Sequence, residues 1–208
     1  MCSDYPYAKL QARLELAHPL PWTEKWSAEE DFLLLVAEHC LAHKPSSILE
    51  CSSGLSTLVL ARCCQLNGRG QVISLENGEE FAQATRDNLA SLGLEEHARV
   101  LHAPLGRQEV NGQAFEWYSP PMLPERIDIL VVDGPPGFLQ KHSRYPALPL
   151  LRERLVDGCH IYLDDAARED EREIADLWCQ EIPGLTHTYL DYQRGCSVFV
   201  LKENTGTA

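Results

Sequence analysis

From about Ser46 onward, short apolar runs alternate with segments of helical periodicity. Five of these runs have the length of β-strands, and we predict strands at Ser47–Glu50, Gln71–Glu76, Ala98–His102, Ile127–Val132 and His160–Leu163. The fourth run is nearly all apolar, as expected of a central parallel strand covered on both faces. Strands that alternate with helices indicate an α/β fold, a mostly parallel sheet with helices on both faces.

The segments between the strands predict the helices. A capping-box pattern at Ser27–Glu30 precedes an apolar stripe formed by Phe32, Leu35, Val36, His39 and Cys40. Further helices are predicted at residues 56–66, 145–155 and 167–181, and another carries Phe81, Ala84, Leu89 and Leu92 before it ends at Gly93. We expect residues 1–45 to form a helical cover that belongs to the same domain as residues 46–208.

Two segments depart from simple alternation. Glu109–Tyr118 predicts a β-hairpin, with Asn111 and Gly112 as its turn. Near the C-terminus, two strand-like runs at Thr186–Asp191 and Cys196–Leu201 are joined by a short turn. Because the connection is short, this last pair is predicted to be antiparallel.

Composition and charge narrow the classes of partner. The 208 residues include 18 Lys and Arg against 31 Asp and Glu, a net charge of −13, which disfavours nucleic acid and anionic membranes. No apolar run has the length of a membrane span, and Met1–Tyr5 lacks the basic-then-apolar order of a signal peptide. The eight cysteines are scattered without a CxxC pair. These features predict a cytoplasmic protein with reduced thiols.

A turn of small residues, Glu50–Ser56, follows the first predicted strand. Small residues let the backbone approach a ligand, and the helix that follows offers unpaired N–H groups to an anionic group. Glu76 ends the second predicted strand, where its carboxylate can accept hydrogen bonds from two ribose hydroxyls. A plain strand-to-helix turn, with Glu76 as a solvated strand end, is the alternative.

The turn resembles the first motif of class I S-adenosylmethionine-dependent methyltransferases, E-x-G-x-G-x-G/S. Glu50, Gly54 and Ser56 match this motif, whereas Ser52 stands where its first glycine is expected. The resemblance extends over Asp128–Gly137, Arg144–Leu148, Leu163–Arg168 and Trp178, which look like a bacterial methyltransferase-like group. It implies a Rossmann-like sheet, O-methyl transfer to a small-molecule acceptor, and cofactor contacts from Glu50, Ser52, Gly54, Ser56, Glu76 and Asp133.

Three carboxylates are predicted to converge at the ends of the fourth and fifth strands, from Asp133, Asp164 and Asp165. The arrangement is similar to metal-dependent catechol and caffeoyl-coenzyme A O-methyltransferases, and it implies a Mg²⁺ or Ca²⁺ site. Asp133, Lys141 and His142 are the candidate catalytic residues. If no metal binds, Asp165 is instead the N-cap of the next helix and Asp133 only binds the cofactor's ammonium group.

Three aromatic residues and the activity itself each allow two interpretations. Trp117, Tyr118 and Phe138 either form the walls of an acceptor site or pack the hairpin onto its own domain.

The chain is either an enzyme or a non-catalytic, regulatory binding protein on the same scaffold, since fold does not fix function. A nicotinamide-dependent enzyme is disfavoured by the antiparallel C-terminal pair and by the absence of a G-x-G-x-x-G motif. The oligomeric state is open, a homodimer being one option.

Overall fold

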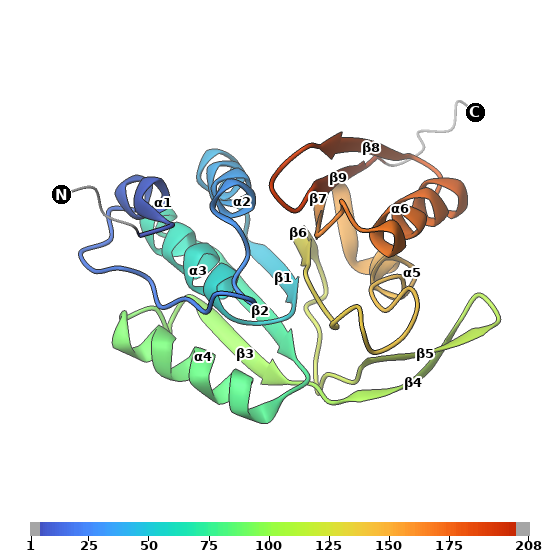
Figure 1. Ribbon diagram of the computed structural model, residues 1–208, viewed down its shortest axis with the longest axis horizontal. Coiled ribbons are helices and arrows are strands. Elements are labelled where there is room, and N and C mark those ends of the chain that lie inside the picture. The colour runs from blue at the N-terminus through green and yellow to red at the C-terminus, as the bar shows by residue number, and fades with distance from the viewer. Residues whose placement is uncertain (1–4, 203–208) are drawn as a thin grey trace.

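The computed structural model describes residues 5–202, in which seven strands form one sheet of order β3-β2-β1-β6-β7-β9-β8 (Figure 1). The strands are β1 (Ser47–Cys51), β2 (Gln71–Glu76), β3 (Ala98–His102), β6 (Ile127–Val132), β7 (Leu155–Asp164), β8 (Leu185–Leu190) and β9 (Cys196–Leu201). β9 is antiparallel to both of its neighbours, and the other pairs are parallel. The predicted fold class is therefore confirmed.

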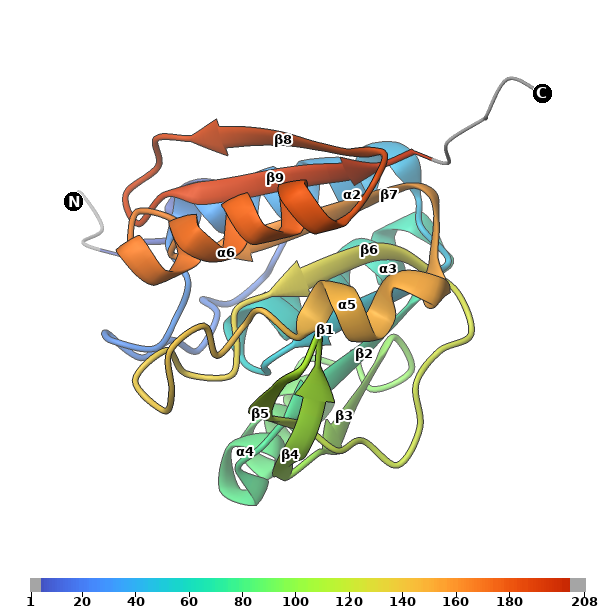
Figure 2. The ribbon, with the colours of Figure 1, turned by 90° about the vertical axis from the view of Figure 1, so that its right-hand side faces the viewer.

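The sheet is covered on both faces. The helices α1 (Ala8–Arg13), α2 (Glu30–His43), α3 (Leu55–Asn67) and α4 (Glu79–Ser91) share one apolar cluster with Ile129 and Val131 of β6. The alternate residues Leu130 and Val132 belong to the cluster of the other face, with α5 (Ala147–Leu151), α6 (Glu169–Glu181) and the hairpin of β4 (Leu105–Val110) and β5 (Gln113–Tyr118). Figure 2 shows α5, α6 and the hairpin on the side facing the viewer.

The strand order reverses between β1 and β6, which pair in parallel at the centre of the sheet. Just beyond β1, Ser52 N–H donates to the carbonyl of Leu75 at 3.0 Å, and Asp133 N–H donates to the carbonyl of Cys51 at 3.1 Å. Ligands of open α/β sheets bind beyond the carboxyl ends of the strands at such a reversal. The fold thus places the turn after β1 and the residues after β6 where a ligand is expected.

The predicted capping box at Ser27 is wrong. Helix α2 begins at Glu30, its N-cap residue Glu29 makes no side-chain capping bond, and Ser27 Oγ instead accepts the N–H of Thr23 at 2.9 Å. Glu30 Oε1 accepts the N–H groups of Lys9 and Leu10 at 2.8 and 3.0 Å. The glutamate therefore satisfies the free donors at the start of α1 rather than those of its own helix.

The predicted apolar stripe of α4 is confirmed at Leu89 and Leu92 and is wrong in the first half of the helix, where Ala82 and Thr85 are buried instead of Phe81 and Ala84. Its buried residues are Ala82, Thr85 and Leu89, whereas Phe81 is 57% exposed. Small side chains let this helix pack closely on the sheet. The ring of Phe81 lies beside Gly78 at the N-terminus of α4, where a Cβ atom on Gly78 would meet it at 2.6 Å.

The helix predicted at residues 145–155 is shorter than expected. α5 spans only Ala147–Leu151, a 3-10 turn covers Arg152–Arg154, and β7 begins at Leu155, which pairs with Ile127 of β6. The pairing extends the strand five residues before the predicted start at His160. Pairing with β6 therefore makes Leu155, which the helical pattern assigned to a helix, the first residue of a strand.

The structure describes seven of the eight cysteines. Cys40, Cys51, Cys63, Cys64, Cys159 and Cys196 are free and buried, Cys179 is free and exposed, and Cys2 lies outside the described residues. Within residues 5–202, no helix combines the length and apolar character that crossing a bilayer requires.

Candidate functional site

The turn after β1 has an unusual backbone. Ser52 has φ of 133° and Gly54 has φ of 145°, a region in which side chains other than glycine are rare. Gly54 is the N-cap residue of α3 and has no Cβ to clash, whereas Ser52 has one. A positive φ at the position where the motif has its first glycine therefore places backbone strain at Ser52.

Replacing Ser52 by glycine is expected to raise the free energy of unfolding by about 1 kcal/mol. Strain of about 1–3 kcal/mol is relieved, and the added entropy of the unfolded chain offsets about 0.5–1 kcal/mol of that gain. Urea unfolding followed by circular dichroism measures the difference. Ser119→Gly, at an exposed position without positive φ, is the control and should lose stability. A Ser52→Gly variant less stable than the wild type would contradict the strain argument.

Glu50 supports the turn from inside the protein. Its side chain is fully buried, and Oε2 accepts hydrogen bonds from the hydroxyls of Thr57 and Ser74, both at 2.6 Å. Burial raises the pKa of Glu50 to about 7, although hydrogen bonds from Ser56, Ser74 and Thr57 oppose the shift. Glu50 and the equally buried Ser56 are therefore placed to hold the turn in shape rather than to face solvent.

Glu76 lies at the end of β2, beside the same turn. Its Oε2 accepts the hydroxyl of Ser53 at 2.9 Å, and its Oε1 accepts the N–H of Gly78 at 3.0 Å. Ser53 was not among the predicted site residues, although it lies inside the predicted turn. The Ser53 hydroxyl joins Glu76 to the turn, so the two predicted halves of a cofactor site are in contact.

The three predicted aspartates do come together. One carboxylate oxygen each from Asp133, Asp164 and Asp165 lie within 4.8 Å of one another. Strand β7 ends at Asp164, and Asp165 adopts a left-handed conformation with φ of 57°, so both neighbours reach the same place. The N-cap role considered for Asp165 is wrong, because Arg168 is the N-cap residue of α6.

Arg144 lies among these carboxylates, and the sequence reasoning missed it. Its side chain is 3% exposed, and Nη2 donates to Asp165 Oδ2 at 2.9 Å and to Asp133 Oδ1 at 3.1 Å. Nη1 donates to the backbone carbonyl of Asp164 at 2.9 Å. In the sequence Arg144 stands between the polar run Gln140–Ser143 and the apolar run Tyr145–Leu151, so its only signal was its place at the start of an apolar run.

The cluster around Arg144 contains more carboxyl groups than guanidinium groups. Glu171, which is 1% exposed, lies 3.7 Å from Arg144 Nε, and Arg168 Nη1 lies 2.9 Å from Asp165 Oδ2. Four carboxyl groups, of Asp133, Asp164, Asp165 and Glu171, thus face two guanidinium groups. Burial raises the pKa of Asp133 to about 6 against the opposing effect of Arg144, and burial followed by Asp133 and Asp165 raises that of Asp164.

The cluster does not fit the divalent cation that the family resemblance implied. An ion bound by all three aspartates would have to share them with the guanidinium of Arg144, which is within 3.1 Å of Asp133 and Asp165. Two cationic centres at that spacing repel each other strongly in a buried site. Arg144 supplies the positive charge that a metal would otherwise bring.

Lys141 and His142 lie in the loop between β6 and α5, and both pair with α6. Lys141 Nζ and His142 Nε2 contact Glu173 Oε2 at 2.7 and 2.6 Å, and His142 N–H donates to Asp170 Oδ2 at 2.7 Å. The two residues predicted as catalytic candidates therefore fasten the loop to the helix. Their ion-pair partners are acids of α6 rather than the aspartate cluster.

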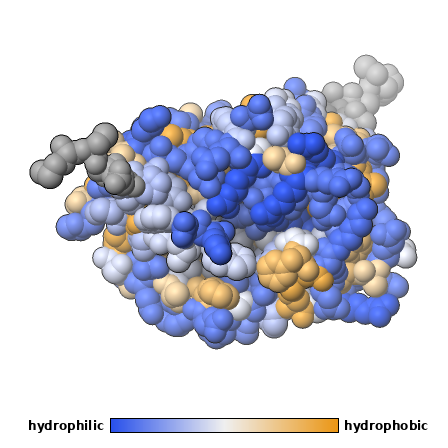
Figure 3. All heavy atoms as spheres, in the orientation of Figure 1, coloured by the Kyte–Doolittle hydropathy of each residue, from blue (hydrophilic) through white to orange (hydrophobic). Residues whose placement is uncertain are grey.

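The three aromatic residues considered for the acceptor site fall into two groups, buried and exposed. Trp117 and Tyr118 are each 3% exposed and pack the hairpin onto the domain, whereas Phe138 is 76% exposed. The ring of Phe138 meets that of Trp26 edge to face, with centroids 6.4 Å apart. Apolar spheres gather over the loop between β6 and α5 on a largely hydrophilic face (Figure 3). Phe138 therefore remains a candidate acceptor contact, and the hairpin aromatics are core residues.

The model of a family described as a methyltransferase domain matches residues 49–166, more than half of the 208-residue chain. This chain belongs to that family. The match covers the turn after β1, Asp133, Arg144 and both aspartates at the end of β7. It confirms the prediction of a methyltransferase and favours an enzyme over a non-catalytic scaffold protein.

Solved methyltransferases share the fold across nearly the whole chain. An O-methyltransferase from Bacillus cereus in complex with SAH is 18% identical, covers 96% of this chain and 91% of its own, and has a TM-score of 0.66. The O-methyltransferase TomG from Streptomyces achromogenes, involved in tomaymycin synthesis and in complex with SAM, is 14% identical, with coverage of 94% and 87% and a TM-score of 0.64. SAH-bound methyltransferase PaMTH1 from Podospora anserina is 14% identical, with coverage of 95% and 88% and a TM-score of 0.64.

Proposed function

We propose that this methyltransferase binds S-adenosylmethionine at the carboxyl edge of the sheet and methylates an oxygen atom of a small-molecule acceptor. The observation that carries the proposal is the buried cluster of Asp133, Asp164, Asp165 and Glu171 around Arg144, next to the turn after β1. O-methyltransferases with the same fold, crystallised with SAM or SAH, support it.

The charge of the cluster suits this cofactor. S-adenosylmethionine carries a positively charged sulfonium and a positively charged ammonium group, and the cluster has two more carboxyl groups than guanidinium groups. Asp133, whose side chain is 18% exposed, is the member best placed to hold the ammonium group. Glu76 holds the ribose hydroxyls, and the backbone from Ser52 to Ser56 holds the methionine carboxylate at the start of α3.

The chain's contribution to the reaction is to orient the acceptor and to take its proton. When bound, S-adenosylmethionine would supply a methyl group that passes in line from its sulfonium sulfur to the acceptor oxygen, with S-adenosylhomocysteine as the leaving group. Asp133 accepts the hydroxyl proton, since a pKa raised to about 6 makes it a base at neutral pH. Lys141 and His142 keep the loop closed against α6 through Glu173, so the proposal gives them a positioning role.

The loop beside the cluster favours an acceptor with a ring. A Cβ atom on Gly137 would lie 3.6 Å from Glu171 Oε1, so the chain just before Phe138 packs against the cluster. The exposed rings of Phe138 and Trp26 then offer apolar area next to the charged centre. A flat apolar acceptor that carries a hydroxyl group matches both surfaces.

The proposal extends to domain organisation, partners and location. Leu10 and Leu14 are buried in the same apolar cluster as Ile48 and Val72, which supports one domain formed by the segments 1–45 and 46–208, although residues 1–4 and 203–208 lie outside the described part. The net charge of −13 supports a small-molecule partner rather than nucleic acid, and the free cysteines support a cytoplasmic location.

Glu76→Ala is expected to weaken binding of S-adenosylhomocysteine, the demethylated product, roughly ten- to a hundredfold for each ribose hydrogen bond lost. Hydrogen bonds to a charged carboxylate contribute about 1.5–3 kcal/mol each. Isothermal titration calorimetry of wild type and variant measures the change.

The matched control is Glu80→Ala, an exposed glutamate in the first turn of α4, for which affinity should not change. Unchanged affinity in Glu76→Ala would remove Glu76 from the site. An absence of binding in the wild type would contradict the use of S-adenosylmethionine.

A further inference from the structure

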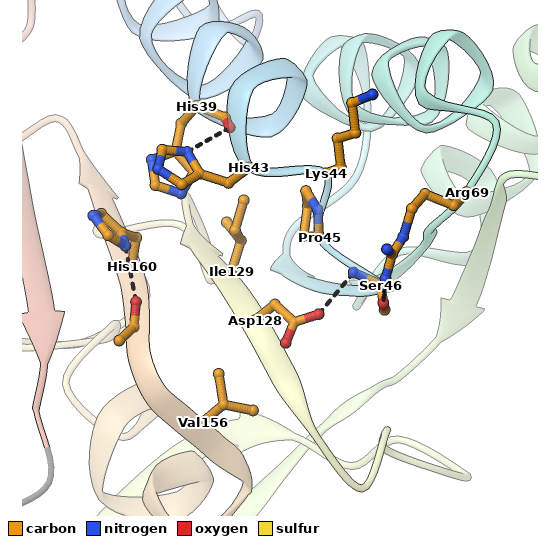
Figure 4. Close-up of a pocket in the computed structure, with 11 residues that line it drawn as sticks. His39, His43, Lys44, Pro45, Ser46, Arg69, Asp128, Ile129, Val156 and His160 are labelled. Atoms are coloured by element: carbon orange, nitrogen blue, oxygen red, sulfur yellow. Dashed lines mark hydrogen bonds between the residues drawn. The ribbon is translucent and has the colours of Figure 1, made fainter.

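A separate group of polar side chains lies away from the aspartate cluster, toward the other end of the sheet. A pocket of about 310 Å³ is lined by His39 and His43 of α2, His160 of β7, and residues at the start of β1 and β6 (Figure 4). His160 precedes Asp164 by four residues of β7, about 13 Å along the strand. The pocket is therefore distinct from the proposed methyltransferase site.

Three imidazole rings gather at one side of this pocket. The centroid of the His39 ring lies 4.1 Å from that of His43 and 4.1 Å from that of His160, and the centroids of His43 and His160 are 6.0 Å apart. His39 and His43 are four residues apart, so both project from the same face of α2. Two histidines at this spacing on a helix, joined by a third from another element, can serve together as nitrogen ligands once their rings turn, since in this structure their ring nitrogens do not all lie within 4.8 Å of one another.

Hydrogen bonds fix the tautomer of two of the rings. Nδ1 of His43 lies 3.1 Å from the carbonyl oxygen of His39, and Nδ1 of His160 lies 3.0 Å from the carbonyl oxygen of Gly158. A carbonyl oxygen only accepts, so each Nδ1 carries the proton, and Nε2 of the neutral ring keeps its lone pair. Metal-binding histidines are commonly oriented in this way, by a backbone acceptor on the nitrogen that does not bind.

The two basic side chains that line this pocket, Lys44 and Arg69, are directed away from the three rings. Figure 4 shows the side chain of Lys44 pointing away from the three rings, and Arg69 on the far side of the pocket from them. Arg69 donates to Ser46 Oγ, so its charge is directed elsewhere.

We infer that His39, His43 and His160 bind a borderline divalent metal ion, Zn²⁺ or a chemically similar ion, with water completing the coordination. Imidazole nitrogen suits such ions better than Mg²⁺ or Ca²⁺, which prefer oxygen ligands. The stacked rings of His39 and His43 have to separate to direct both nitrogens at one ion, and His43 is exposed and can turn.

A metal ion held in this way would connect two layers of the fold. Two of its ligands lie on α2 and the third lies on β7, so the ion fastens the helical layer to the sheet. Because the ion binds the folded chain and not the unfolded one, it raises the melting temperature by mass action. The site is independent of the methyl transfer proposed above.

The test is Zn²⁺ titration of the chelator-treated full chain by calorimetry, with Co²⁺ absorption as a spectroscopic report of imidazole ligands. We expect one ion per chain, and binding at least about tenfold weaker in each of His39→Gln, His43→Gln and His160→Gln. All three side chains are at least partly exposed, so these variants should fold, which circular dichroism checks. His97→Gln, a partly exposed histidine outside the pocket, should bind Zn²⁺ like the wild type.

Glu173→Gln guards against a competing site, because His142, Asp170 and Glu173 also bring ligand atoms within 4.8 Å of one another. Loss of Zn²⁺ binding in Glu173→Gln, with binding retained in His39→Gln and His160→Gln, would overturn the inference. So would a wild-type chain that binds no Zn²⁺ or shows no imidazole bands with Co²⁺.

Discussion

Replacement of Arg144 by leucine is expected to lower the free energy of unfolding by about 3–5 kcal/mol. Removing one partner of a buried ion pair leaves the remaining charge without compensation, a loss of that size. Here the guanidinium is the hydrogen-bond donor to Asp133 and Asp165 and to the carbonyl of Asp164. Urea unfolding at pH 8 measures the loss, with Arg172→Leu on the exposed side of α6 as the control, expected to stay within about 0.5 kcal/mol.

The loss in Arg144→Leu should depend on pH in a defined direction. Without the guanidinium, the buried carboxyl groups have folded-state pKa values further above their unfolded values. A raised folded-state pKa favours the protonated folded form, so stability is retained at low pH and lost as pH rises. The variant should therefore lie closer to the wild type at pH 5 than at pH 8. An equal loss at both values would assign the effect to packing.

The same variant tests whether the guanidinium of Arg144 or a metal ion compensates the charge of the aspartates. In the wild type, thermal unfolding should give the same melting temperature with chelator, with Mg²⁺ and with Ca²⁺, because Arg144 already neutralises Asp133 and Asp165. In Arg144→Leu, millimolar Mg²⁺ or Ca²⁺ should raise the melting temperature, since Asp133 and Asp164 are then free for a hard cation and Asp165 keeps only the exposed Arg168 as its partner. A metal response in the wild type that Asp164→Asn abolishes would restore the metal site.

The bounds of a strand or turn could be predicted from the sequence wherever the residues of that segment alone determine them. The runs Gln71–Glu76, Ala98–His102 and Ile127–Val132 are strands with the predicted bounds, and Asn111–Gly112 is the hairpin turn, as predicted. The errors lie where contacts with residues far away in the chain determine the local structure. β7 starts early because Leu155 pairs with Ile127, and Glu30 caps α1, twenty residues earlier in the chain, instead of taking part in a capping box at Ser27.

The acidic residues of the site could be predicted from the sequence, whereas its buried arginine, Arg144, could not. Asp133, Asp164 and Asp165 follow strand ends, and parallel strands bring their carboxyl ends to one edge, so their meeting follows from topology. Arg144 reaches the same place from the loop that precedes α5. In a loop, no helical or strand periodicity predicts the direction of a side chain. Likewise, His39 was predicted as part of an apolar stripe and His43 carried no prediction, and the contact of His160 with both rings depends on how α2 packs against β7.

Asp133→Asn is expected to lower kcat/KM by about 10²–10⁴ while S-adenosylhomocysteine still binds, because the amide cannot accept the acceptor's proton. In the wild type, Asp133 has a pKa raised to about 6 by burial, so kcat/KM should rise with pH up to about 6 and level off above it. The measurement is S-adenosylhomocysteine released from S-adenosylmethionine and a hydroxyl-bearing aromatic acceptor between pH 5 and 8, with exposed Asp176→Asn as the control.

The competing role for Asp133 is to hold the cofactor's ammonium group alone. In that case Asp133→Asn should weaken cofactor binding, leave kcat near the wild-type value at saturating S-adenosylmethionine, and keep the pH dependence of the wild type. An Asp133 that also accepts the proton predicts a low kcat that saturation does not restore and a profile without the rise toward pH 6. The carboxylate sits between Arg144 and the partly open edge of the sheet, 3.1 Å from the guanidinium. That position lets it stay ionised at neutral pH while one face remains free for a hydroxyl group, which is the arrangement that a base needs.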